Sequence, residues 1–169
     1  MDLKPTALYG ELWIPVQAIK APLIKPATYV DHGISGAWEF SDNTDDTIVS
    51  DMRIPYRMNR NIAPTFNIGW DAGGISAGNS KWQIEYLWRA LNEDTTALAQ
   101  AIEIVVTSSS AVASNGMVMS TINMQKPDED DVCLHLRVKR LGADTADTIV
   151  GVTYLKGICM RFNLLDRER

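Results

Sequence analysis

Two short runs of acidic residues are the first places in this sequence where side chains of a chemically active type gather. Asp42, Asp45 and Asp46 form one run, and residues 128–131 form the other. Carboxylate oxygens are the ligands that Ca²⁺ prefers. Neither run has the glycine at position six and the glutamate at position twelve of the helical calcium loop, and acidic residues grouped in turns are ordinarily solvated. The sequence therefore predicts no metal site and no cofactor.

Candidates for catalysis are equally few. His32 and His135 lie far apart in the chain, and residues 108–110 are serines in a run of small residues without the Gly-x-Ser-x-Gly turn of a nucleophile. The glycine-rich stretch 71–78 lacks the Lys-Ser/Thr ending of a phosphate-binding loop. Since no acid, base and nucleophile converge, the sequence predicts no catalytic residue and a protein that is not an enzyme.

Three aromatic residues of one predicted strand have two interpretations, a carbohydrate-binding platform or part of the core. Trp82, Tyr86 and Trp88 alternate with polar residues and share one parity. Exposed, they would form a flat platform that stacks on sugar rings. If they are buried, they are large core residues, and aromatic side chains that share one face of a strand are more often in the core. We expect the core position and keep the carbohydrate platform as the alternative.

The elements that position these residues are predicted to be strands. Apolar and polar residues alternate with period two between turn residues, as in half-buried strands. One short helix is expected at Thr95–Gln100. The expected strands are Ala37–Ser41, Thr47–Ile54, Ile62–Trp70, Trp82–Leu91, Ile102–Val106, Met117–Gln125, Val132–Arg140, Thr148–Thr153 and Tyr154–Leu164. Their spacing predicts an all-β fold, an antiparallel two-sheet sandwich that is jelly-roll-like, with a closed barrel as the alternative.

Shared parity within each strand also predicts the core. Tyr154 and Phe162 are expected on the inward parity of the last strand, together with Ile158 and Met160. The predicted core residues of the whole sandwich are Ile48, Met52, Phe66, Ile68, Trp82, Ile84, Tyr86, Ile104, Leu134, Leu136, Val138, Ile158 and Met160.

The first 33 residues differ from the rest because Pro5, Pro15, Pro22 and Pro26 interrupt any helix there. The sequence therefore predicts an extended N-terminal arm over residues 1–33, a β-sandwich domain over 34–165 and a short tail over 166–169. The arm is too apolar for a solvated linker, so it either packs along its own domain or reaches a neighbouring subunit. The predicted partner-binding residues are Leu8, Tyr9, Leu12, Trp13, Ile14, Val16, Ile19 and Leu23.

Composition excludes several classes of partner. The formal net charge of -5 and the pI near 5.0 argue against nucleic acid, whose phosphates require clustered Lys and Arg. Cys133 and Cys159 have no Cys-x-x-Cys spacing and are expected to be free thiols made in a reducing compartment. The sequence predicts no signal peptide and no membrane span, because it has neither an apolar segment after a basic start nor a long uncharged apolar run.

Five short motifs follow one another along the chain. They are Arg53-Ile54-Pro55, Trp82-Gln83-Ile84-Glu85-Tyr86, Leu134-His135-Leu136-Arg137-Val138, Asp144-Thr145-Ala146-Asp147-Thr148 and Leu155-Lys156-Gly157-Ile158. Their order resembles that in a group of virion structural proteins of tailed bacteriophages; the resemblance covers residues 36–162 and leaves the arm outside.

The resemblance implies a non-enzymatic sandwich displayed on a phage virion, made in the bacterial host cytoplasm. Its first expectation is a capsid cement or decoration protein that binds the major capsid protein or other virion proteins. A homotrimer would suit this role, because capsid lattices offer three-fold positions. The alternative is a tail or receptor-binding component with a carbohydrate-binding sandwich.

Overall fold

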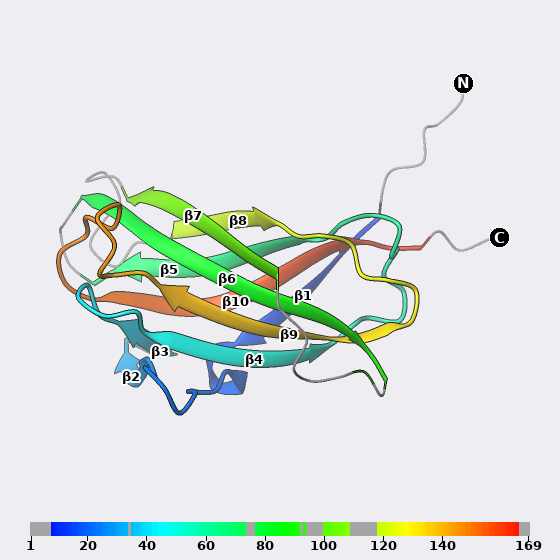
Figure 1. Ribbon diagram of the computed structural model, residues 1–169, viewed down its shortest axis with the longest axis horizontal. Helices are drawn as coiled ribbons and strands as arrows, with labels where there is room; N and C mark the ends of the chain where they lie inside the picture. The colour runs from blue at the N-terminus through cyan, green and yellow to red at the C-terminus, as the bar shows by residue number, and fades with distance from the viewer. Residues whose placement is uncertain are drawn as a thin grey trace, which may run out of the picture.

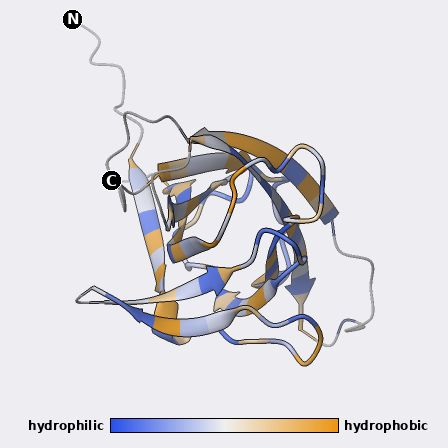
Figure 2. Ribbon diagram, turned by 90° about the vertical axis from the view of Figure 1, so that its left-hand side faces the viewer, coloured by the Kyte–Doolittle hydropathy of each residue, from blue (hydrophilic) through white to orange (hydrophobic). Residues whose placement is uncertain are grey.

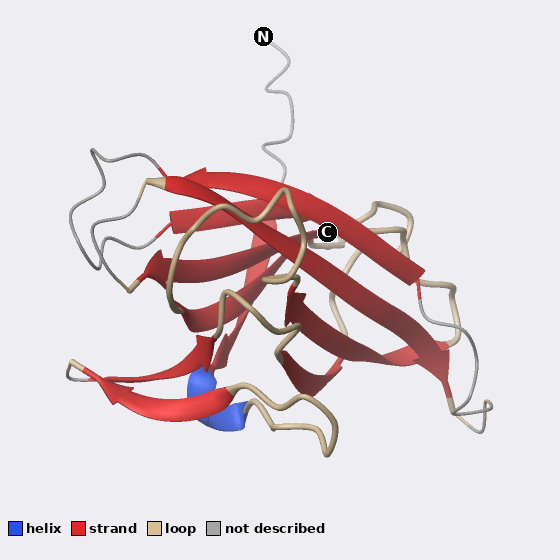
Figure 3. Cartoon of the chain, turned by 60° about the vertical axis from the view of Figure 1, so that its left-hand side comes forward, coloured by secondary structure: helices blue, strands red, loops and turns tan. Residues whose placement is uncertain are grey.

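The computed structural model describes residues 8–33, 35–73, 77–91, 93, 100–108 and 118–165, with the side chains of 107 and 108 left out. In these ranges the strands form two antiparallel sheets that face each other (Figure 1). The predicted all-β, two-sheet sandwich is therefore confirmed. Figure 3 shows a single short helical turn among the strands of the described ranges.

The two sheets differ in size. The larger has the order β2-β3-β10-β5-β8, with β1 also paired to β10, and the smaller has the order β4-β9-β6-β7. The larger contains β1 (Tyr9–Pro15), β2 (Thr28–His32), β3 (Ser35–Phe40), β5 (Thr65–Ala72), β8 (Val118–Asn123) and β10 (Thr153–Asn163). The smaller contains β4 (Thr47–Arg53), β6 (Gly78–Ala90), β7 (Gln100–Ser108) and β9 (Asp131–Arg140).

The inward-facing side chains of both sheets fill the space between them, because alternate residues of a strand point to opposite faces. Figure 2 shows apolar and polar residues alternating along the strands. All of the predicted core residues are buried except Ile104, which is partly buried and packs against the core. Trp82 lies at the centre, with ring centroids 5.2 Å from Phe40 and 5.9 Å from Trp70. The predicted register of the core is confirmed.

The last strand departs from its predicted parity at one point. Leu155 is fully buried, whereas Tyr154, expected in the core, is only half-buried. The pairing of β10 with β5 shifts register between Leu155 and Gly157, and such a bulge reverses the face of the residues before it. The expected strand at Thr148–Thr153 is also wrong, because β10 begins at Thr153. Of the expected helix at Thr95–Gln100, residues 95–99 lie outside the described residues, and Gln100 begins β7.

The N-terminal segment is extended, as predicted, but its described part belongs to the sandwich. β1 pairs with β10 over its whole length, from Tyr9 opposite Asn163 to Pro15 opposite Gly157. The 3-10 helix η1 (Val16–Ala18) follows, and isolated bridges then join Lys20 to Val49 and Pro26 to Thr47. The strand pairing thus shows no boundary near residue 33. The arm packs in cis because β10 offers β1 an unpaired edge and the core accepts its apolar side chains.

Arg140 joins the two sheets at one end of the sandwich. Its side chain is fully buried, and Nε and Nη2 donate to the two carboxylate oxygens of Asp147 at 2.9 and 2.8 Å. The remaining donors reach three backbone carbonyls, those of Phe40 at 3.1 Å and of Ile149 and Gly151 at 2.7 Å each. All five N–H groups of the guanidinium are therefore satisfied, which a buried charge requires.

Replacing Arg140 by methionine should lower the free energy of unfolding by about 3–5 kcal/mol, because Asp147 would remain buried without its cation. Urea denaturation measures this change. Arg137→Met is the matched control, since the Arg137 side chain is 50% exposed and its loss should cost less than about 1 kcal/mol. Equal effects of the two variants would contradict the structural role assigned to Arg140.

Candidate functional site: the β1 face

The aromatic residues of β6 do not form an exposed platform. Trp82 and Tyr86 are buried in the core, and the Tyr86 hydroxyl accepts a hydrogen bond from the backbone N–H of Gln125 at 2.9 Å. Trp88 is partly buried against the core, and its Nε1 donates to the carbonyl of Gln125 at 3.0 Å. The alternative of a carbohydrate platform on this strand is therefore wrong, because the face that carries these rings is the inner face of the smaller sheet.

The residues predicted to bind a partner separate into two groups. Ile14, Val16 and Ile19 are buried in the core, and the partly buried Leu12 packs against it. The alternation of β1 and the turn of η1 direct them inward. The other four, Leu8, Tyr9, Trp13 and Leu23, are exposed. Whether any of these binds a partner stays a prediction.

Tyr9, Glu11 and Trp13 point to the outer side of the larger sheet, since alternate residues of a strand share a face. In the paired strands, Trp13 lies opposite Cys159, Cys159 opposite Asn67, and Asn67 opposite Thr121. The next row places Glu11 beside Arg161 and Arg161 beside Thr65. We call this surface the β1 face; it consists of Tyr9, Glu11, Trp13, Thr65, Asn67, Thr121, Cys159 and Arg161.

Trp13 lies close against the neighbouring strand because that strand carries a glycine. A Cβ atom added to Gly157 would lie 2.3 Å from Cζ2 and 2.9 Å from Cε2 of Trp13. The six-membered part of the indole therefore covers the Gly157 backbone. Gly157 is paired with Gly69 on β5, which likewise has no side chain to crowd the ring. The opposite side of the ring faces outward, and Trp13 as a whole is 47% exposed.

Polar groups surround the two exposed rings of the β1 face. Nε and Nη2 of Arg161 donate to Oε1 of Glu11 at 2.9 and 2.6 Å, and the Thr121 hydroxyl donates to Oδ1 of Asn67 at 2.6 Å. A shallow hollow of about 590 Å³ lies beside Tyr9, between these charged and hydroxyl groups. The arrangement offers apolar ring surface next to hydrogen-bonding groups, which suits an amphipathic polar ligand.

Cys159 lies on the same face but is not a reactive group. Its side chain is covered, with 7% exposed. Burial raises the pKa of the Cys159 thiol, and the Glu11 carboxylate nearby adds to this effect. A thiol in such surroundings remains protonated at neutral pH and is a poor nucleophile.

A buried carboxylate lies further along the outer side of the larger sheet. Asp71 of β5 is 1% exposed, and neither of its oxygens has a hydrogen bond. Nε2 of His32 lies 3.6 Å from Oδ1, and Nζ of Lys156 lies 3.5 Å from Oδ2. The imidazole of His32 packs on the ring of Tyr154, with the two ring centroids 4.1 Å apart. Burial raises the pKa of Asp71, and Lys156 and His32 oppose this only in part.

The raised pKa of Asp71 should make the protein less stable as the pH rises. Between the usual aspartate pKa of about 3.9 and the raised value, the native state binds more protons than the unfolded chain, so the free energy of unfolding falls with pH. Asp71→Asn should reduce this fall, as measured by urea denaturation midpoints across that range. Asp31→Asn, at an exposed residue of β2, should leave the slope unchanged. The same slope in all three proteins would refute the assignment to Asp71.

The sequence patterns missed the β1 face and the Asp71 group for different reasons. Tyr9, Glu11 and Trp13 already show period-two alternation, but the surrounding prolines favoured an arm. Asp71 gives no signal, because its proximity to His32 and Lys156 depends on strands far apart in the chain. Among the described residues, no three His, Cys, Asp or Glu side chains lie close enough to share a metal ion. The described part of the chain also contains no helix with the length and hydrophobicity needed to cross a membrane.

No protein-family model and no curated protein matches this chain. Among solved structures, a family 35 carbohydrate-binding module from Cellvibrio japonicus has a TM-score of 0.51 and 11% identity, covering 89% of this chain and 92% of the module. A family 15 xylan-binding module has a TM-score of 0.48 and 12% identity, covering 93% and 97%. A family 22 carbohydrate-binding module of Clostridium thermocellum has a TM-score of 0.49 and 13% identity, covering 87% of each chain. The likeness to the family 35 module supports the jelly-roll-like sandwich fold.

Proposed function

We propose that this protein is a non-catalytic carbohydrate-binding sandwich that holds an oligosaccharide along the β1 face. The observation that carries the proposal is the pair of exposed rings at alternating positions of one strand, Tyr9 at 63% and Trp13 at 47% exposure, on either side of the Glu11–Arg161 ion pair. The family 35 carbohydrate-binding module, which has a similar fold, supports the same function.

The chemistry of the β1 face matches that of a sugar chain. The apolar C–H side of a pyranose ring stacks on an aromatic plane, while its hydroxyls accept from Arg161 and donate to Glu11. Four residues of a strand span about 13 Å, so a ligand that contacts both Tyr9 and Trp13 is longer than one sugar ring. This face therefore fits an oligosaccharide or a stretch of polysaccharide.

The described residues of the β1 face lack the means to hydrolyse such a ligand. Glycosidases ordinarily use two carboxyl groups that flank the scissile bond. Among the residues of this face only Glu11 carries a carboxylate, and that carboxylate accepts hydrogen bonds from Arg161. The proposed role is therefore binding without turnover.

Trp13→Ala should weaken glycan binding by about tenfold or more, equivalent to about 1.4 kcal/mol, because it removes the larger stacking surface. Affinity electrophoresis against a panel of soluble plant and bacterial polysaccharides identifies the ligand, and calorimetry then measures the change. Tyr9→Ala should give a smaller loss. Tyr56→Ala is the matched control, since Tyr56 is 96% exposed and lies outside the β1 face.

Two outcomes would refute the carbohydrate proposal. One is that no polysaccharide in the panel binds the intact protein. The other is that Trp13→Ala and Tyr56→Ala bind the identified polysaccharide with the same affinity. Gly157→Ala gives an independent check, because the added methyl group must displace the Trp13 ring while its own residue stays in β10.

A second candidate function is that of a phage virion structural protein, in the form of a capsid cement or a tail component. The motif order described above supports it, together with Leu23 and Ile24, which are 102% and 79% exposed on one loop. Apolar side chains this exposed are typical of an interface. In this role the protein would bind the major capsid protein or other virion proteins as a homotrimer, after synthesis in the host cytoplasm. A tail component that binds surface glycans would combine both candidates.

The virion candidate predicts that the protein binds purified phage heads or tails in a sedimentation assay. Leu23→Asp should abolish this binding, whereas Trp13→Ala should leave it intact, which separates the two candidate functions. Failure of the wild-type protein to sediment with either particle would contradict the virion role. Light scattering tests the trimer separately, and a monomeric mass would restrict any trimer to the particle itself.

A further inference from the structure

The loop that carries Leu23 and Ile24 is fixed to the sandwich on both sides. The N–H groups of Lys20 and Val49 donate to each other's carbonyls at 2.9 Å. On the other side, the N–H of Ala27 donates to Thr47 O at 2.9 Å, and the N–H of Thr47 donates to Lys25 O at 2.8 Å. Both ends of the loop are therefore joined to the edge of β4, and its exposed tip does not need to be ordered when a partner binds.

The backbone of the loop is restricted further. Pro22 and Pro26 flank the apolar tip and fix their own φ angles. Lys25 has a φ of 49°, in the left-handed region that non-glycine residues seldom adopt. Such a conformation persists only where its surroundings hold it, and it is common at binding sites. Ile19 and Ala27 are buried at the two ends of the loop, which leaves Leu23 and Ile24 outside the core.

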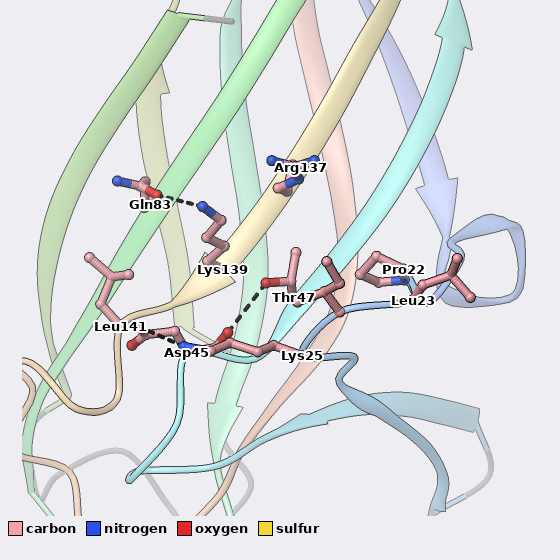
Figure 4. A pocket seen from close by; sticks show the side chains of 10 residues that line it. Pro22, Leu23, Lys25, Asp45, Thr47, Gln83, Arg137, Lys139 and Leu141 are labelled. Carbon is pink, nitrogen blue, oxygen red and sulfur yellow. Dashed lines mark hydrogen bonds and ion pairs between the residues drawn. The ribbon is translucent and has the colours of Figure 1, made fainter.

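A cleft of about 560 Å³ separates this loop from the outer side of the smaller sheet. Figure 4 shows Leu23 and Pro22 on one side and Arg137, Lys139 and Gln83 on the other. Lys25 and Asp45 lie near the base of the loop, where their side chains form an ion pair of 3.5 Å. One wall is therefore aliphatic and the other is polar and basic. We call this the loop–β9 cleft.

The charge of the cleft is opposite to that of the whole protein. Lys25, Arg137 and Lys139 line it with three positive charges, against one negative charge from Asp45. Glu85, behind the lining, pairs with both Arg137 and Lys139. Counting Glu85, three cations face two anions, which leaves one positive charge in a chain whose net charge is -5.

Arg137 retains capacity to bind a ligand. Its Nη1 donates to Oε2 of Glu85 at 2.7 Å, and its side chain is 50% exposed. A guanidinium has five N–H donors in a planar fork that matches a carboxylate. An incoming carboxylate can therefore bind Arg137 without breaking the pair with Glu85.

We infer that the loop–β9 cleft binds an acidic peptide segment of a partner protein, with a branched aliphatic side chain against Leu23 and Ile24 and a carboxylate on Arg137. The two walls of the cleft match these two parts of the ligand. A sugar would favour an aromatic plane, and none of the residues that line the cleft is aromatic. The inference requires neither glycan binding nor a virion location.

The test uses the full-length protein, immobilised and panned against a random displayed dodecapeptide library. We expect the enriched peptides to combine Asp or Glu with Leu, Ile or Val. Fluorescence anisotropy of an enriched peptide should then show weaker binding at high salt, because the contact with Arg137 is partly exposed. Enrichment of basic or neutral peptides, or of no peptide, would overturn the inference.

Variants locate the peptide on the protein. Leu23→Asp and Arg137→Gln should each lower the affinity of the protein for the enriched peptide by about tenfold or more. Tyr56→Asp and Lys126→Gln are the matched controls, because both residues are exposed and lie outside the cleft lining. Equal losses in controls and cleft variants would overturn the proposed site. Trp13→Ala should not change peptide affinity, so failure here is distinguishable from failure of the carbohydrate proposal.

An acidic polysaccharide serves as the competing ligand. If polygalacturonate binds through Arg137 and displaces the peptide at a lower concentration than a neutral polysaccharide does, the cleft is a glycan site and the peptide inference is overturned. If polygalacturonate does not compete, the assignment to an acidic peptide stands. Circular dichroism of each variant confirms that it is folded before its affinity is compared.

Discussion

The buried pair of Arg140 and Asp147 is the contact on which the closure of this sandwich depends. A charge inside a protein is tolerated only when its donors and acceptors are paired, and here a single guanidinium serves β9, the end of β3 and the connection from β9 to β10. Asp147 also accepts from the backbone N–H of Lys81 in β6 at 3.0 Å. The pair therefore links both sheets and fixes where β10 enters the larger one.

The position of β10 in turn decides what β1 becomes. β10 has β5 on one side, and its other side is shared by β3 at residues 153–155 and by β1 at residues 157–163. Because β1 is added to that free edge, its alternate residues are divided between the core and the solvent. The same pairing that buries Ile14 presents Tyr9 and Trp13 on the outer side. The candidate glycan site is thus a consequence of how the edge of the larger sheet is completed.

The two outer surfaces of the sandwich have different chemistry, which favours different ligands. The β1 face combines flat rings with a few polar groups, whereas the loop–β9 cleft combines aliphatic side chains with cations. They lie on opposite sheets, so occupation of one leaves the other open. The two proposals together place a glycan on one side of the sandwich and a partner protein on the other, with no change of fold.

The sequence by itself determined the core and most strands from β3 onward, because period-two alternation acts locally: Trp82, Ile84 and Tyr86 are inside wherever the partner strands lie. It also showed that residues 9–15 are extended. The bulge near Leu155, the cis packing of β1, the grouping of Asp71 with His32, and the cleft beneath Leu23 were decided by the tertiary structure. Each of these depends on which strands become neighbours, and that choice is set by long-range pairing and burial, for which one strand carries no local signal.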